Sequence, residues 1–89
     1  MSLVLDGTNG LSDIDGSAAT PAIRGTDTNT GIFFPAADTI AFAEGGAEAM
    51  RIDSSANVGI GTSSPTAKLD VATSINLGLN YLNVGFDIG

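Results

Sequence analysis

The chain has 89 residues, of which ten are acidic and three are basic, and its formal net charge is −7. Nucleic-acid phosphates and anionic membrane surfaces both select clustered lysine and arginine, so this charge argues against either as a partner. The sequence has no cysteine for a disulfide framework and no apolar run near the ~20 residues of a membrane-spanning helix, so we expect no membrane insertion.

A chain of this length is predicted to form a single domain, residues 1–89, with a small core. Its first part, residues 1–20, is expected to be rich in loops. A short β-favouring run at residues 2–5 leads into repeated turn signals over residues 6–19, which leave room for one short strand.

The middle part, residues 21–71, carries most of the predicted strands. Residues 21–24 are predicted to be an edge strand, because Pro21 at its start cannot donate to a ladder. The threonine-rich residues 26–30 and the apolar run at residues 32–34 follow, and Pro35 ends that run.

A hairpin over residues 38–53 is the clearest local prediction. Ile40 and Phe42 alternate with small residues before the turn, and Met50 and Ile52 alternate with Ala49 and Arg51 after it. A glycine pair between two such runs is typical of a short hairpin loop.

Residues 51–71 are predicted to form a compact β unit with two internal turns. Residues 54–57 have turn composition, and residues 58–61 alternate β-branched side chains with Gly59 and Gly61. We expect this glycine face to lie against neighbouring backbone, because glycine permits such an approach. A break at residues 62–65 precedes a last strand at residues 68–71, with Leu69 and Val71 on one face.

The C-terminal part, residues 72–89, shows regular alternation. Apolar residues occupy every second position, first at odd-numbered and then at even-numbered positions. The change between the two patterns falls at Asn80 and Tyr81, where it predicts a turn or bulge. The two sets are Ile75, Leu77 and Leu79, then Leu82, Val84, Phe86 and Ile88. No segment has a sustained helical period, so the predicted fold is all-β, built from short antiparallel strands and hairpins.

One stretch resembles a known kind of sequence. "RIDSSANVGIGTSSPTAKLDV" at residues 51–71, preceded by "PAIRGTDTNTGIFFPAADTIAFAEGGAEAMRID", is similar to a segment that recurs in bacteriophage tail fibres and other virion structural proteins. The likeness covers residues 18–71 and fades after Val71. Ala56 stands where that segment usually has glycine, which is unfavourable for a turn that needs a positive φ there.

The resemblance implies a structural, non-catalytic role as a shaft or connector segment of a tail fibre, located in the virion after expression in the host cytoplasm. Such fibres are trimers with other virion proteins as partners. Composition points the same way, because 15% charged residues is low beside the roughly 25% typical of soluble domains. We therefore expect an intertwined fibrous homotrimer, β-prism-like or β-helix-like, with the C-terminal alternating strands as its shared core. A hexamer or an edge-paired dimer would bury the same apolar strands.

The acidic residues of the N-terminal part are one possible site. Asp6, Asn9, Asp13 and Asp15 form an acidic cluster, but an EF-hand needs further oxygen ligands and a bidentate glutamate, so we expect turn-capping aspartates and no bound metal or cofactor. Asp13 with Asp15 could serve acid–base chemistry only in a cleft between subunits. No histidine or cysteine is present, and we expect no enzyme activity.

Other motifs also have simpler interpretations. Residues 26–30 could form a small threonine array of the ice-binding kind, but one copy predicts an ordinary strand or loop. Gly45–Gly46 and Gly59-x-Gly61 lack the lysine of a phosphate loop. Glu44 and Glu48, beside the hairpin turn, are expected to be solvated.

The alternative function is a receptor-binding module for host-cell glycans. Tyr81, Phe33 and Phe34 would be its sugar-stacking residues, although a core position is the preferred interpretation for both phenylalanines.

Overall fold

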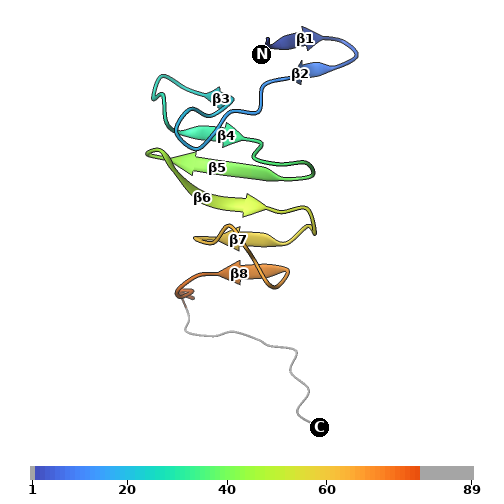
Figure 1. Cartoon of the computed structure of the whole chain (residues 1–89). Helices are drawn as coiled ribbons and strands as arrows, with labels where there is room; N and C mark the ends of the chain where they lie inside the picture. The colour runs from blue at the N-terminus through green and yellow to red at the C-terminus, as the bar shows by residue number, and fades with distance from the viewer. Residues whose placement is uncertain (1, 79–89) are drawn as a thin grey trace.

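The computed structural model describes residues 2–78, which form eight strands and no helix (Figure 1). The strands are β1 (Val4–Asp6), β2 (Gly10–Ser12), β3 (Ile23–Arg24), β4 (Gly31–Phe33), β5 (Ile40–Glu44), β6 (Ala47–Ile52), β7 (Val58–Ile60) and β8 (Leu69–Val71). The all-β prediction is confirmed for this part of the chain.

Strands β3 to β8 form one six-stranded sheet in sequence order, so the chain enters at one edge and leaves from the other (Figure 1). Every neighbouring pair is antiparallel except β7 and β8, which are parallel. The prediction of antiparallel strands alone is therefore wrong at this end of the sheet.

The hairpin of β5 and β6 is the predicted one. Gly45 and Gly46 occupy its turn with φ of 61° and 83°, and two residues with positive φ match the twist of a two-residue hairpin loop. The register then shifts, because Phe42 pairs with Met50 but Ala43 pairs with Glu48. Ala49 is the extra residue of this β-bulge, and its carbonyl accepts the Gly61 N–H at 3.0 Å.

The parallel pairing of β7 and β8 depends on Gly59. The connecting residues 61–68 cross the sheet face directly over this glycine, and a Cβ placed on it would lie 2.5 Å from the Thr62 carbonyl oxygen. Pro65 of the same connection is buried above it. The predicted backbone approach is thus confirmed at Gly59, whereas Gly61 lies after the strand and has a positive φ of 79°.

The turn between β6 and β7 lies at residues 54–57, as predicted, and Asp53 stabilises it by accepting backbone hydrogen bonds. The Asp53 carboxylate accepts the N–H groups of Ser55 and Asn57, and its carbonyl accepts that of Ala56 at 2.9 Å. Ala56 has a φ of 63°. The left-handed turn is therefore kept without the glycine that normally favours it.

The N-terminal part contains the strands that were expected. The β-favouring run at residues 2–5 leads into β1, and the one short strand expected within residues 6–19 is β2. The two strands form a separate hairpin, and Leu5 pairs with Leu11 across it. Asp6 holds the turn because its carboxylate accepts the Thr8 and Asn9 N–H groups. The predicted edge strand is confirmed as β3, and Pro21 before it forms an isolated bridge with Gly16.

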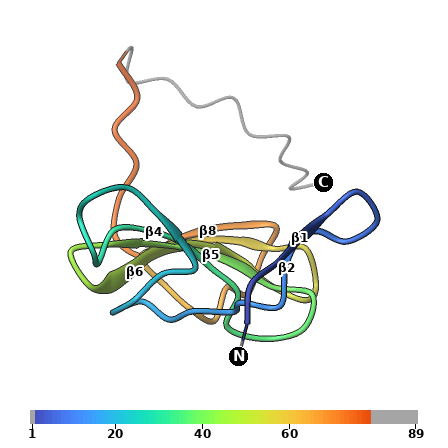
Figure 2. The ribbon, with the colours of Figure 1, turned by 90° about the horizontal axis from the view of Figure 1, so that it is seen from above.

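The core lies on one side of the six-stranded sheet. Its buried apolar residues are Phe33, Ala41 and Ala43, with Ala18 packed against them. Seen from above in Figure 2, the segment between β2 and β3 runs along one side of the sheet. The core therefore uses the small side chains of β5, and Ile40 and Phe42 face the other way.

After β8 the chain leaves the sheet (Figure 2). The Ala72 N–H donates to the Ile60 carbonyl at 3.0 Å, and residues 72–78 contain no strand. The predicted strand at Ile75 and Leu77 is wrong for these residues, because they do not pair with the β8 edge. The rest of the predicted C-terminal strands, residues 79–89, lies outside the described residues.

Candidate functional site

The most extensive feature of the described chain is an apolar sheet face. This face has two rows of apolar side chains that run across the strands. The first row has one residue from each strand of the sheet, each paired with the row's residue on the neighbouring strand: Ile23, Ile32, Phe42, Met50, Ile60 and Val71. The second row, two residues along, consists of Ile40, Ile52, Val58 and Leu69. These ten residues, here called the apolar face, share one side because side chains in strands alternate with period two.

None of the ten side chains is buried. Ile23 is 46% exposed, Ile40 and Ile60 are each 42% exposed, and Leu69 is 57% exposed. Scattered exposed leucines need no explanation, but a contiguous apolar patch of this kind marks an interface or an aggregation site.

The opposite side is built differently, with small residues under the chain's own loops. A Cβ on Gly31 would lie within 3.0 Å of the Pro21 Cβ, and Gly59 meets Thr62 and Pro65. Glycine and alanine on this side let residues 13–22 and 61–68 cross close to the sheet. The described loops thus cover the face with small residues and leave the face with large ones open.

Glu48 and Arg51 lie on this covered side as a bidentate ion pair. Both Arg51 Nε and Nη2 donate to Glu48 carboxylate oxygens at 2.7 Å, and each side chain is 18% exposed. Hydrogen bonding to Glu48 raises the pKa of the Arg51 guanidinium above its usual value, although burial opposes it. The expectation that Glu48 is solvated is wrong, whereas Glu44 is exposed as expected.

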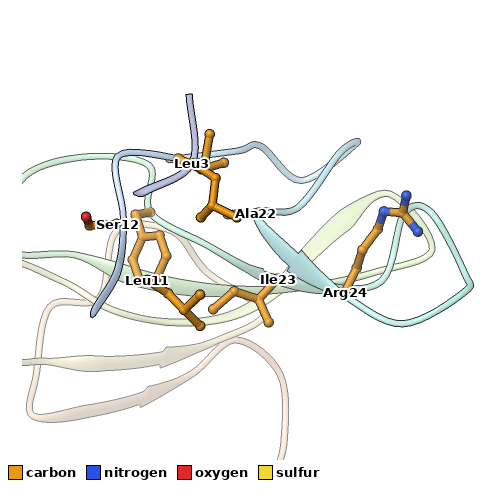
Figure 3. A pocket seen from close by; sticks show the side chains of 8 residues that line it. Leu3, Leu11, Ser12, Ala22, Ile23 and Arg24 are labelled. Carbon is orange, nitrogen blue, oxygen red and sulfur yellow. The ribbon is translucent and has the colours of Figure 1, made fainter. Parts of the chain in front are cut away.

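The apolar face continues toward the N-terminal hairpin. A hollow beside Ile23 is lined by Leu3, Leu11, Ile14 and Phe34, and Figure 3 shows the Leu11 and Ile23 side chains close together while Arg24 extends away. Leu5 and Leu11 on the hairpin are also exposed.

A second hollow lies beside the second row of the apolar face. Ile40 and Ile52 line it together with Phe34, Thr39 and Ala56. Phe34 therefore stands between the two hollows, and both of them border the apolar face.

The acidic cluster does not assemble. Within residues 2–78, no group of three or more histidine, cysteine, aspartate or glutamate side chains is placed to hold a metal ion. Asp6 is the turn-capping aspartate that was expected, and its pKa is held below the ordinary value by hydrogen bonds from the Asn9 backbone, the Asn9 side chain and the Thr8 backbone. Asp13 and Asp15 are exposed loop residues.

The threonine-rich residues 26–30 form a turn between β3 and β4, not a strand, so no flat threonine face exists there. Thr30 Oγ1 donates to the Asp27 carboxylate at 3.0 Å and accepts the Gly45 N–H at 3.2 Å, and the Gly46 N–H donates to the Asn29 carbonyl at 2.8 Å. The amides of the glycine pair are therefore engaged within the chain and do not cradle a phosphate.

The candidate sugar-stacking residues differ in their burial. Phe33 is only 4% exposed and belongs to the core, so it cannot stack on a glycan. Phe34, expected to be core as well, is only partly buried between the two hollows. Tyr81 lies outside the described residues.

Alternation within each strand was visible in the sequence, but the alignment of the strands into one row was not. The extra residue at Ala49 and the parallel return of β8 decide which residues face together. The usable signal was the repeated pair of β-branched or large apolar residues in residues 40–42, 50–52, 58–60 and 69–71.

Among residues 2–78 the structure has no helix that could cross a bilayer. Comparisons with protein-family models, with curated proteins and with solved structures gave no match.

Proposed function

We propose that the chain is a non-catalytic structural segment of a phage tail fibre or a similar virion appendage, where it serves as shaft or connector and assembles as a homotrimer. Its partners in the virion are copies of itself and other tail proteins. The sequence resemblance described above supports this role, and the structure supplies an observation that favours it independently.

That observation is the combination of sequential strand order with an open apolar face. Six neighbouring strands advance in chain order, about 24 Å from first to last at the usual strand spacing. The apolar rows run across the strands, in the direction in which successive strands are added to the sheet. Copies that meet through these rows would therefore form an elongated body, and each chain would advance along its long axis. A shaft segment needs this property, whereas an enzyme needs a shaped cleft with converging polar groups.

Small-angle X-ray scattering of the assembled protein, together with a glycan array, tests the role. We expect a rod-like particle and no glycan binding. Reproducible binding to one glycan class that is lost in Phe34→Ala, with assembly intact, would contradict the shaft role and favour the receptor-binding alternative. Leu5→Ala, on the exposed N-terminal hairpin, is the matched control for loss of an apolar side chain.

A further inference from the structure

We infer that the apolar face is buried against the same face of other copies of this chain. The inference rests on the proposed function, which requires self-assembly but names no surface. The shared core inferred here is the ten-residue apolar face of the six-stranded sheet. It is not the C-terminal strands that the sequence favours.

The first reason is that the chain needs a partner in order to fold. Its described core contains three buried apolar residues, two of them alanines, and no large side chain in the described part is fully buried. A core of this size supplies little stability. The covering partner must therefore be present whenever the chain is made, and another copy meets that condition.

The second reason is charge. A chain with a net charge of −7 repels its own copies over most of its surface. The two rows of the apolar face contain no charged or polar side chain. Two copies can therefore approach through this face without placing like charges opposite one another, which is costly in strand pairs and in interfaces.

The third reason is size. Two rows about 7 Å apart, extending about 24 Å across the strands, outline an area of about 170 Å², well below the ~800 Å² per partner of a standard interface. A single face-to-face pair would thus be small. Three copies around an axis along the strand-to-strand direction let each face contact two others, and the two hollows beside Phe34 lie where neighbouring side chains can enter.

Thiol protection tests this assignment, because the chain has no cysteine and an introduced one is the only thiol. Ile60→Cys places it on the apolar face, where it would be exposed in a single chain. Ser63→Cys places the control in the connection on the covered side, three residues away and also exposed. Ile40→Cys replaces Ile60→Cys if that variant does not fold.

The reaction of each variant with an aromatic disulfide reagent is followed with and without denaturant, and the mass is measured by light scattering. We expect a trimer in which Cys at position 60 reacts at least about tenfold more slowly than Cys at position 63, with the difference abolished by denaturant. An oligomer in which both react equally fast would overturn the assignment while leaving self-assembly intact. A folded monomer would overturn self-assembly as well.

A second pair of variants separates the apolar face from the C-terminal part. Ile60→Asp should yield monomeric or unfolded chains, whereas Ser63→Asp, with the same charge change, should assemble as the parent does. Leu77→Asp should also leave assembly intact. If Leu77→Asp abolishes assembly and Ile60→Asp does not, the shared core lies in the C-terminal part and the assignment is wrong.

Discussion

Glu48 and Arg51 are three residues apart in β6, yet they lie on the same side of the sheet and form two hydrogen bonds of 2.7 Å. In a regular strand, residues of odd separation point to opposite faces. The bulge at Ala49 removes this conflict, because it adds one residue between the two without a partner on β5. The same extra residue places Met50 in the first row of the apolar face, so the ion pair and that face depend on one irregularity.

The ion pair leads to the first prediction. Arg51→Lys keeps the charge but loses the forked geometry, and we expect a loss of about 1 kcal/mol of unfolding free energy. Glu48→Gln should cost a similar amount, with a double-mutant coupling of comparable size. Urea unfolding at fixed protein concentration measures all of these. Arg24→Lys is the control, since Arg24 is exposed and donates to the Gly25 carbonyl; equal effects at positions 24 and 51 would contradict the role of the pair.

The crossing of the chain over Gly59 leads to the second prediction. Gly59→Val should destabilise the fold by roughly 3 kcal/mol or more, although valine has the higher strand propensity, because its Cβ would collide with the Thr62 carbonyl oxygen. Gly61→Val should also destabilise, because Gly61 has a φ of 79°. Thermal unfolding is the measurement.

The matched control is Gly25→Val, because a Cβ at Gly25 meets no atom within 4 Å and its φ lies outside the left-handed region. We expect it to change the melting temperature little. Melting of both Gly59→Val and Gly61→Val at or above the parent temperature would show that the close approach does not limit this strand.

Ala56 gives a prediction of the opposite sign. An L-residue in the left-handed region costs about 1–2 kcal/mol, so Ala56→Gly should stabilise the protein by roughly 1 kcal/mol after the added freedom of the unfolded chain is subtracted. Ala47→Gly, in β6 and with ordinary φ, should instead destabilise it by about 0.5–1 kcal/mol. Chemical unfolding measures the stability of both variants. Destabilisation by Ala56→Gly as well as by Ala47→Gly would contradict the prediction.

The hairpin turn at Asp6 should respond to acid. Because its folded pKa is lowered from the ordinary 3.8, the carboxylate contributes stability that is complete above that value and is lost as the pH falls through the lower folded pKa. In NMR titrations we expect the Thr8 and Asn9 amide shifts to move with a midpoint below 3.8. Asp6→Asn keeps an acceptor oxygen and should show no such titration. A midpoint at or above the ordinary value would contradict the capping interaction.

Local chemistry in the sequence was sufficient for several elements. The glycine pair at residues 45–46 indicated the β5–β6 hairpin, the turn composition of residues 54–57 indicated the next turn, and Pro21 marked the sheet edge. In each case a few neighbouring residues determine the backbone conformation, so a short window contains the information.

Features that depend on non-local contacts were not predictable in this way. The parallel return of β8 requires the connection to pass over Gly59, and the bulge at Ala49 requires the Gly61 N–H as a partner for its carbonyl. Each involves residues of two strands at once. The apolar face cannot be assigned without both, so the sequence alone favours the more regular alternation of the C-terminal part as the shared core.

The central claim is that the folded unit is an assembly of identical chains, and sedimentation equilibrium at micromolar concentration tests it most directly. We predict a species of about three times the 8.9 kDa chain mass, with unfolding and dissociation occurring together. A stable 8.9 kDa species with a cooperative melt would contradict the claim, because a single chain would then fold with its apolar face open to water.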